Sequence, residues 1–589
     1  MDSKKDTYSD NVIDSKVNVL SSELRTATLD KCKKFENIRG KTCEHPFWDV
    51  VVLSALDDAQ KKAYETQLAD KQSRKELPLS PAYHVVHDPV GVKVGNGGGV
   101  IAVLDELEKI YNKKLKTLKV LILLSGGYSQ RLPSASLLGK IFTALPMGDP
   151  IYQMLEFKLA MYIDFPTRMK PGVFVSSADC IELYELQGDG WNFNSPGFTS
   201  LAHPSPIEIG TTHGVHVLEN LEEYAKNFKK DSASVGNCRR FIHKPSKEFM
   251  RASGAVFLTD SEEYVFSDSA YFMDMDAAHL LLEWYRKRNG LNCEIDAYGD
   301  FLQALGPEAT KEYCKNVQNV TQVLPELIKT REEIFDILQN TEHHVLMLNK
   351  SKFYHIGTTK EYIENFCMDK CFRNEMGCSN HAMVKCPKSL ESLKPNNVIF
   401  HSSLKNLVGL TENVVIEYTS LNFANDIGME SIISNNIFPS GVRVPAKSFL
   451  HTVVIRDEDY PLYVTVAFGV EDNLKKCCNS RSDTKSLKYA GLPFNEALDK
   501  LNLLQDPWSE DCVLLNLWHA KLFPAFYDPE DAVQNGAKML EACRTSKRYK
   551  ITSKKAVYSC NYSMADVLRL KDLEKILEMR SKLRKEIES

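Results

Sequence analysis

Two glycines and two basic residues follow one short apolar run of the sequence, and their types and spacing suit an anion. Residues 118–124 are typical of a buried strand, and the run stops abruptly at Ser125-Gly126-Gly127. Because glycine has no side chain, the backbone N–H groups of this bend can close on a phosphate, and Arg131 and Lys140 supply the positive charge that a phosphate needs. The sequence therefore predicts a phosphate cradle, although two glycines after a strand are also a common turn.

A second glycine-rich stretch has a similar setting. A strand at 83–86 runs into the glycines of residues 95–99, and an apolar-periodic helix follows at 100–111. The N-terminus of such a helix can bind phosphate, in which case Gly97 and Gly98 contact the nucleotide. Tight packing explains the same glycines, and the sequence alone does not decide between the two. Neither glycine-rich stretch is a P-loop, because neither is followed by Lys-Ser/Thr at Walker spacing.

Asp179 follows another predicted buried strand, residues 172–176. In an open parallel α/β sheet, ligands collect outside the carboxyl ends of the strands, so we expect Asp179 on the same edge as Gly126 and Gly127. A carboxylate there can hold Mg²⁺, which prefers one or two carboxylates together with phosphate oxygens. The alternative is that Asp179 caps a helix over 180–183.

Two polar clusters are candidate contacts for a small polar ligand. Thr212 and His213 lie between glycines in residues 209–215, although a β-bulge would use the same glycines. Glu294 and Asp296 belong to a run with three carboxylates in seven residues, which suits sugar hydroxyls or a second metal contact but also helix capping.

The composition is that of an ordinary soluble protein. A net charge of −5 and a pI near 6.3 give no overall attraction to nucleic acid, so we expect no nucleic-acid partner. The N-terminus has no apolar leader, and no run of about 18 apolar residues could span a bilayer, so we expect no membrane association and a cytoplasmic protein. Fifteen cysteines, an odd number, fit reduced thiols better than a disulfide framework.

One cysteine-rich segment could be taken for a zinc site. Its spacing, however, is not the paired short-knuckle pattern of structural zinc sites, which favours free thiols. The residues are Cys367, Cys371, Cys378, His381 and Cys386.

Patterning divides the chain into four parts. A polar, helical lead (1–44) precedes an α/β domain (45–380), because apolar runs alternate there with helical stripes. In 381–470 aliphatic residues recur every six residues with one five-residue step, which is typical of a parallel β-helix. Residues 471–589 are predicted to be mostly helical and basic. The aliphatic repeat consists of Val415, Leu421, Ile427, Ile433, Phe438, Val444 and Leu450.

The last predicted helix begins at a capping box formed by Ser563 and Asp566. Its apolar stripe, from Val567 to Leu577, favours docking on the β-helix, with self-association as the alternative. The sequence does not determine the oligomeric state.

Several stretches resemble sugar-1-phosphate nucleotidyltransferases and, within them, the fucose-1-phosphate guanylyltransferase family. The loop at 125–133 resembles the G-G-x-G-x-R-L signature of the former, although Ser129 replaces its third glycine and Gly139 replaces the proline before the lysine. The resemblance implies a Rossmann-like nucleotidyltransferase domain, a short left-handed β-helix, and synthesis of GDP-L-fucose and pyrophosphate from GTP and L-fucose 1-phosphate in fucose salvage. The stretches are VGNGGG at 94–99, SGGYSQRLP at 125–133, GKIFTALP at 139–146, IGTTHGV at 209–215, EIDAYGDFLQALG at 294–306 and FYHIGTT at 353–359.

A mechanism follows from this resemblance and from the residue types. A sugar phosphate is already an anion, so catalysis needs charge cancellation and in-line positioning rather than a general base. The roles so implied are triphosphate binding by Ser125, Gly126, Gly127 and Arg131, contact of Lys140 with the reacting phosphates, Mg²⁺ binding by Asp179, and sugar-phosphate binding by Thr212, His213, Glu294 and Asp296.

Three other functions can be weighed against this one. A sugar kinase would need a P-x-x-x-G-L-x-S-S loop, which the sequence lacks. A non-catalytic nucleotide-sugar-binding protein could lose Lys140 or Asp179, but both are present. A pyrophosphorylase for another sugar 1-phosphate would keep all of these residues.

Overall fold

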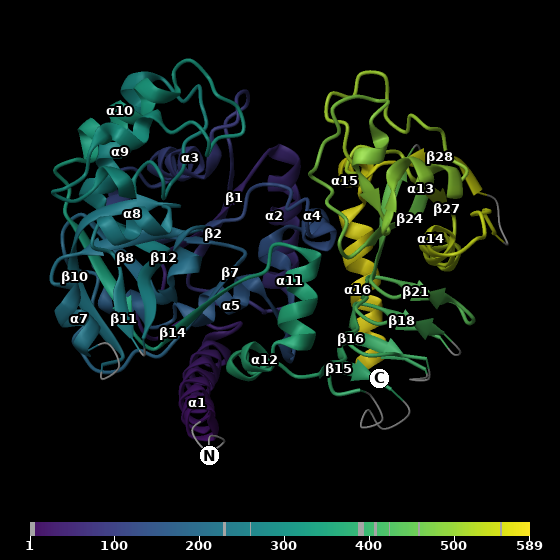
Figure 1. Ribbon diagram of the computed structural model, residues 1–589, viewed down its shortest axis with the longest axis horizontal. Helices are drawn as coiled ribbons and strands as arrows, with labels where there is room; N and C mark the ends of the chain where they lie inside the picture. The colour runs from purple at the N-terminus through teal and green to yellow at the C-terminus, as the bar shows by residue number, and fades with distance from the viewer. Residues whose placement is uncertain are drawn as a thin grey trace. The chain divides into compact units, whose positions relative to one another are not determined.

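A computed structural model describes residues 6–227, 231–259, 261–386, 394–405, 409–422, 425–457, 460–553 and 557–589 (Figure 1). The chain divides into two compact units: the first comprises Met1–Gly127 and Leu155–His355, and the second Tyr128–Met154 and Ile356–Ser589. These limits differ from the predicted boundaries after residues 44, 380 and 470. The chain leaves the first unit directly after the glycine pair, enters the second, and returns.

A ten-stranded mixed sheet organises the first unit. Along its path the order is β2-β1-β3-β6-β12-β8-β13-β10-β9, with β11 beside β12. The first four strands are parallel, as the apolar runs predicted. The strands are β1 (Val50–Ala55), β2 (Ala82–His87), β3 (Lys119–Leu124), β6 (Gly172–Ser177), β8 (Phe198–Pro206), β9 (Gly214–Leu218), β10 (Ala233–His243), β11 (Phe257–Thr259), β12 (Glu262–Asp274) and β13 (His343–Leu348).

Helices of the first unit bury their apolar faces against this sheet. Leu104 of α3, Leu281 of α9 and Ile334 of α10 belong to one buried cluster with Val120 and Val175, and the three helices group together in Figure 1. The helices are α1 (Asp6–Ile38), α2 (Asp58–Ser73), α3 (Gly95–Tyr111), α5 (Met154–Met161), α6 (Ile207–Gly210), α7 (Leu221–Asn227), α8 (Lys247–Ala252), α9 (Met275–Arg288) and α10 (Leu327–Leu338).

Parallel strands form the first part of the second unit. Val398 pairs with Val415, Val415 with Ile432, and Ile432 with Phe449, so successive layers are 17 residues apart. The layers that begin at Val415 and Ile432 each carry three short strands, which accounts for the six-residue steps and the one five-residue step. The predicted repeat is confirmed in the sense that all seven of its residues, six aliphatic ones and Phe438, are buried. The strands are β15 (His381–Lys385), β16 (Val398–Leu404), β17 (Val415–Glu417), β18 (Ser420–Leu421), β19 (Asp426–Ile427), β20 (Ile432–Ser434), β21 (Ile437–Phe438), β22 (Arg443–Val444) and β23 (Ser448–Asp457).

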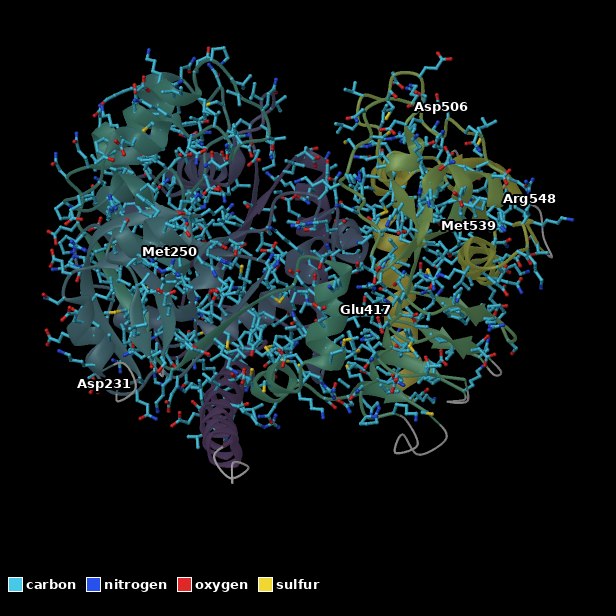
Figure 2. All side chains as sticks on the ribbon, viewed as in Figure 1. Asp231, Met250, Glu417, Asp506, Met539 and Arg548 are labelled. Atoms are coloured by element: carbon cyan, nitrogen blue, oxygen red, sulfur yellow. The ribbon has the colours of Figure 1, made fainter. Side chains whose placement is uncertain are left out.

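The C-terminal region mixes helices with strands, so the prediction of a mostly helical region is wrong. The antiparallel strands β24, β27 and β28 extend the ladder beyond β23, and α14 covers β23 and β24. Side chains fill both units: Met250 is buried in the first and Met539 in the second, whereas Arg548 points outward (Figure 2). The elements are β24 (Tyr460–Gly469), β25 (Lys488–Tyr489), β26 (Leu492–Pro493), α13 (Phe494–Lys500), β27 (Phe523–Phe526), α14 (Pro529–Arg544) and β28 (Val557–Tyr562).

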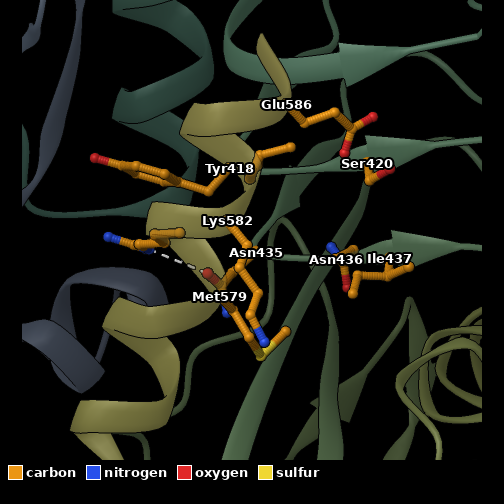
Figure 3. A pocket seen from close by; sticks show the side chains of 10 residues that line it. Tyr418, Ser420, Asn435, Asn436, Ile437, Met579, Lys582 and Glu586 are labelled. Atoms are coloured by element: carbon orange, nitrogen blue, oxygen red, sulfur yellow. Dashed lines mark hydrogen bonds between the residues drawn. The ribbon is translucent and has the colours of Figure 1, made fainter. Parts of the chain in front are cut away.

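The last predicted helix is two helices, α15 (Met564–Leu570) and α16 (Leu573–Glu588), because Lys571 forms a β-bridge with Ile455. The predicted capping box at Ser563 is present. Docking of α16 is confirmed: the Arg580 guanidinium lies 3.5 Å from the centroid of the Tyr418 ring, and Nε donates to Asn435 Oδ1 at 3.1 Å. Figure 3 shows the pocket where the two meet, lined by Met579, Lys582 and Glu586 of α16 and by Tyr418, Ser420, Asn435, Asn436 and Ile437. Within the described part of the chain, no helix is both long and apolar enough to cross a membrane.

Candidate active site

The carboxyl ends of the parallel strands bring the glycine loop and Asp179 to one edge of the sheet. Leu124, the last residue of β3, pairs with Ser177, the last residue of β6, and the Ala178 N–H donates to the Leu124 carbonyl at 3.2 Å. Gly126 and Asp179 each follow two residues later. The predicted common edge is therefore confirmed.

Packing explains why glycines occupy the loop after β3. Ser125 is fully buried and hydrogen bonds through its backbone N–H and its hydroxyl to Ser54. A Cβ on Gly126 would lie 3.2 Å from the Ala55 carbonyl carbon, whereas Gly127 has open space and a φ of +102°. The first glycine thus permits close approach to β1, and the second permits the left-handed bend.

Both loop N–H groups have weak partners. Gly126 N–H donates to Ser54 Oγ and Gly127 N–H donates to Gln60 Oε1, each at 3.3 Å. These bonds are long for N–H···O contacts, so an anion can displace them at small cost. The loop has the N–H groups that a phosphate cradle requires.

Asp179 does not cap a helix. Residues Cys180–Tyr184 form strand β7, which pairs antiparallel with β14 (Ser351–His355), so the predicted alternative of a helix over 180–183 is wrong. Asp179 Oδ1 accepts a hydrogen bond from Ser177 Oγ at 2.7 Å, and Oδ2 lies 3.8 Å from His355 Nε2. The side chain is 19% exposed, so the carboxylate is not fully buried.

Strand β14 links Asp179 to the predicted Thr212–His213 cluster. Phe353 and His355 are two residues apart, so both side chains leave β14 on the same face. The His213 ring packs edge-on against Phe353, with centroids 5.2 Å apart, while His355 contacts Asp179. The structure therefore places His213 and Asp179 on the same face of β14.

A buried carboxylate, Asp268, and a partly buried imidazole, His243, lie near the turn that carries Thr212 and His213. Gly214 N–H donates to Asp268 Oδ1 at 2.8 Å, and a Cβ on Gly214 would collide with the Phe241 ring. Burial raises the pKa of Asp268, opposed by the nearby His243 and His213. Burial lowers the pKa of His243, opposed by the charges of Asp296 and Asp268. Two predicted sugar-binding residues, His213 and Asp296, thus both influence the pKa of the buried Asp268.

The three carboxylates of residues 294–300 have structural partners. Glu294 pairs with Lys93 at 2.9 Å, and Asp300 forms a fully buried ion pair with Arg331 at 2.9 Å. Asp296 Oδ1 accepts the N–H groups of Tyr298 and Gly299 at 2.9 and 2.7 Å. Capping and ion pairing therefore explain these carboxylates, and a role in sugar binding stays a prediction.

The glycines at 95–99 form the first turn of α3 and pack on that same segment. Gly97 N–H donates to the Ile295 carbonyl at 3.0 Å, and a Cβ on Gly95 would lie 2.3 Å from that oxygen. A Cβ on Gly98 would lie 2.5 Å from Val94 Cβ. Close packing accounts for these glycines, and nucleotide contacts by Gly97 and Gly98 stay a prediction.

Arg131 and Lys140 lie in the second unit. The Arg131 carbonyl accepts the Thr359 N–H at 3.0 Å, and its side chain is exposed. Ser129, which replaces a glycine of the related signature, has a φ of +43°, so the left-handed conformation is kept despite its side chain. Lys140 is half-buried and begins a 3₁₀ turn after Gly139, whose φ is +98°.

Comparisons with known proteins agree over nearly the whole chain. The model of the fucose pyrophosphorylase domain matches residues 112–528. Human fucose-1-phosphate guanylyltransferase is 42% identical over 585 residues, which cover 96% of this chain and 95% of the human protein. The mouse fucose-1-phosphate guanylyltransferase is 40% identical, over 96% of this chain and 98% of its own length. An Arabidopsis thaliana bifunctional fucokinase/GDP-fucose pyrophosphorylase is 22% identical, over 81% of this chain and 47% of its own length.

The chain belongs to the fucose pyrophosphorylase family. The range matched by the fucose pyrophosphorylase model runs through both compact units and includes every predicted site residue except Gly97 and Gly98, which precede it. The sequence resemblance is therefore confirmed at the level of the family.

Sequence analysis missed four polar groups of this fucose pyrophosphorylase chain: Asp88, His243, Asp268 and His355. Asp88 directly follows β2 at the carboxyl edge, and burial raises its pKa to about 7. The rule that found Asp179 would also have found Asp88. His355 lies within a recognised stretch, whereas His243 and Asp268 meet only after folding.

The cysteine-rich segment is not assembled into a metal site. Among the residues that the structure describes, no three donors from Cys367 to Cys386 lie close enough together to hold an ion. None of the fifteen cysteines, all of which are described, is paired in a disulfide.

Proposed function

We propose that this chain forms GDP-L-fucose and pyrophosphate from GTP and L-fucose 1-phosphate, the activation step of fucose salvage. The observation that carries the proposal is the similarity to human and mouse fucose-1-phosphate guanylyltransferases over 96% of the chain. The common edge supports the proposal, since the glycine loop, whose N–H groups suit an anion, and the partly exposed carboxylate of Asp179 both lie there.

The reaction requires that the negative charges of its two anionic substrates be neutralised. An oxygen of the sugar phosphate attacks the α-phosphorus of GTP. The bond between the α-phosphorus and the oxygen that bridges it to the β-phosphorus breaks, and pyrophosphate leaves with the electron pair. The nucleophile is already ionised, so no general base is needed. What the protein contributes is in-line positioning of two anions and stabilisation of the charge that builds on the leaving group.

Residues of the glycine loop and its continuation supply that stabilisation. The N–H groups of Gly126 and Gly127 bind the triphosphate in place of their long bonds to Ser54 and Gln60. The Arg131 guanidinium, which is exposed, pairs with triphosphate oxygens, and Lys140 contacts the reacting phosphates. Gly97 supports nucleotide binding by fixing the first turn of α3 on the 294–297 segment, and Gly98 supports it by allowing this turn to pack closely on Val94.

Asp179 fits a Mg²⁺ ligand. It is a hard oxygen donor, Ser177 fixes its orientation, and it is not fully buried. A bound Mg²⁺ would lower the charge on the phosphate groups.

The sugar phosphate binds at Thr212, His213 and Asp296. Thr212 and His213 offer a hydroxyl and an imidazole in a turn that Asp268 fixes through Gly214. Glu294, which pairs with Lys93, contributes by holding the turn that carries Asp296.

Two finer features of fold and location are part of the proposal. We assign a Rossmann-like arrangement to the parallel strands β2-β1-β3-β6 and a left-handed β-helix to the 17-residue layers. The fifteen cysteines, none of which is in a disulfide, suit the reducing cytoplasm, where GTP is available.

Substrate omission tests the proposal. Purified protein with Mg²⁺, GTP and L-fucose 1-phosphate is expected to release pyrophosphate and form GDP-fucose, and free L-fucose should not replace its phosphate. Release of nucleoside diphosphate from free fucose would indicate a kinase instead. Faster turnover with another sugar 1-phosphate would reassign the substrate, and binding of GDP-fucose without any turnover would indicate a binding protein.

A further inference from the structure

Three metal-binding side chains meet inside the sheet of the first unit, on its consecutive strands β13, β10 and β9. They are His343, Cys238 and His216, and their exposed fractions are 3%, 2% and 0%. One donor atom from each lies within 4.8 Å of the others. Within the described chain, no other group of three donors is this close.

A β-bulge brings the thiol into this group. The register of β10 with β9 shifts between Cys238 and Arg240, so that Cys238 opposes Leu218 while Phe241 opposes His216. Bulges re-aim side chains in this way. As a result Cys238 Sγ lies 3.8 Å from His216 Nδ1, and the His216 and His343 rings meet edge-on with centroids 5.4 Å apart.

Both imidazoles have an unused nitrogen. His343 Nε2 bonds to Ser200 Oγ at 2.9 Å, but no described residue hydrogen bonds to His343 Nδ1 or to His216 Nε2. An unpartnered polar atom in a dry interior is unfavourable and calls for an explanation. The contact with Ser200 has the form of the outer partner that orients a metal-binding histidine.

We propose that His216, Cys238 and His343 bind a zinc ion that ties β9, β10 and β13 together. Two imidazole nitrogens and one thiolate suit Zn²⁺, whereas Mg²⁺ and Ca²⁺ require oxygen donors. The site is distinct from Asp179. Its three protein donors leave the fourth position of a tetrahedral zinc ion to a water molecule, and its role is structural because the three side chains are buried. It also fixes strand β9, whose preceding residues include His213.

Zinc binding requires a change of protonation at sulfur. A neutral imidazole nitrogen donates a lone pair to a metal, whereas burial raises the pKa of the Cys238 thiol, so zinc must displace its proton. In the free protein the Cys238 thiol donates to the Arg240 carbonyl at 3.2 Å. Zinc binding forms a zinc–sulfur bond and releases that proton to solvent.

Metal analysis of the untagged, full-length protein tests the site. After growth with added zinc and gel filtration, elemental analysis is expected to find about one zinc ion per chain, as in structural sites. Cys238→Ser should hold less than about a tenth of that amount, since its hydroxyl is a poor zinc ligand. The matched control Cys314→Ser alters a fully buried thiol outside the group and should keep its zinc.

A milder variant keeps the test decisive if Cys238→Ser does not fold. Ser200→Ala leaves all three ligands in place but removes the partner of His343 Nε2, so competition with a chromophoric chelator should show roughly 10–100-fold weaker zinc binding. Cobalt-loaded wild-type protein should show a thiolate-to-metal absorption band. No zinc in the wild-type protein, copper in its place, undiminished zinc in Cys238→Ser, or no thiolate band would overturn the proposal.

Discussion

Removal of the Lys158 ammonium tests the support of the Asp179 turn. Lys158 of α5 and Glu182 of β7 are both fully buried, with Nζ 2.6 Å from Oε2, and Nζ also donates to Ser176 Oγ at 3.0 Å and Tyr162 Oη at 3.1 Å. Ser176 is the last residue but one of β6 and Glu182 lies in β7, so this network joins both sides of the turn that carries Asp179.

Lys158→Met leaves Glu182 charged and buried. Breaking a buried pair in this way costs about 3–5 kcal/mol in the free energy of unfolding. Glu182 Oε1 already has no hydrogen-bond partner among the described residues, which makes compensation by other groups small. For a unit of this size the loss corresponds to a fall in thermal midpoint of roughly 5–15 °C. Turnover should also fall, because the position of Asp179 is no longer fixed.

The assay is differential scanning calorimetry of three variants. The control Lys62→Met removes a lysine whose pair with Asp58 has side chains 73% and 63% exposed, and it should change stability by less than about 0.5 kcal/mol. Lys158→Met combined with Glu182→Gln should recover part of the loss, since the unpaired charge is gone. If Lys158→Met melts at the same temperature as Lys62→Met, the network does not support the turn and the reasoning is refuted.

Three further predictions concern the phosphate site and the second unit. Lys140→Ala should lower turnover about 10²–10³-fold, equivalent to roughly 3–4 kcal/mol of transition-state stabilisation, with an unchanged melting temperature; near-normal turnover would remove Lys140 from the mechanism. Asp179→Asn keeps the shape but loses the charge, so activity should fall and the Mg²⁺ concentration for half-maximal activity should rise; an unchanged Mg²⁺ titration would contradict the assignment. Burial raises the pKa of Asp472 to about 7 against 3.8 for the unperturbed group, so the stability of the wild-type protein should fall as pH rises from about 4 to about 7. The thermal midpoint of Asp472→Asn should fall less across that range. Parallel curves of thermal midpoint against pH for the two proteins would contradict this prediction.

The local sequence was enough to predict those strands in which buried residues are consecutive or recur at a fixed spacing. The apolar runs that became β1, β3 and β6 are buried on both faces, so their sequence alone marks them as central parallel strands. The aliphatic repeat from Val415 to Leu450 was visible because each layer returns to the same face after a fixed number of residues. The common edge of Gly126 and Asp179 followed from the same rule of parallel strands.

Long-range pairing decided what the sequence could not show. Residues Cys180–Tyr184 form a strand because they pair with β14, which lies far along the chain. The sequence near Cys180 does not predict this pairing. The His243 and Asp268 groups come from β10 and β12 and interact only in the folded sheet. Ser129 adopts a positive φ that its residue type disfavours, because the surrounding loop imposes it.

The central claim is that the sugar phosphate attacks the α-phosphorus of GTP, and the fate of its phosphorus tests this most directly. With L-fucose 1-phosphate labelled at phosphorus with ³²P and unlabelled GTP, the label should appear in GDP-fucose, in the phosphate next to fucose, and unlabelled pyrophosphate should form in equal amount. Label in pyrophosphate or in inorganic phosphate, or GDP-fucose without label, would contradict the mechanism.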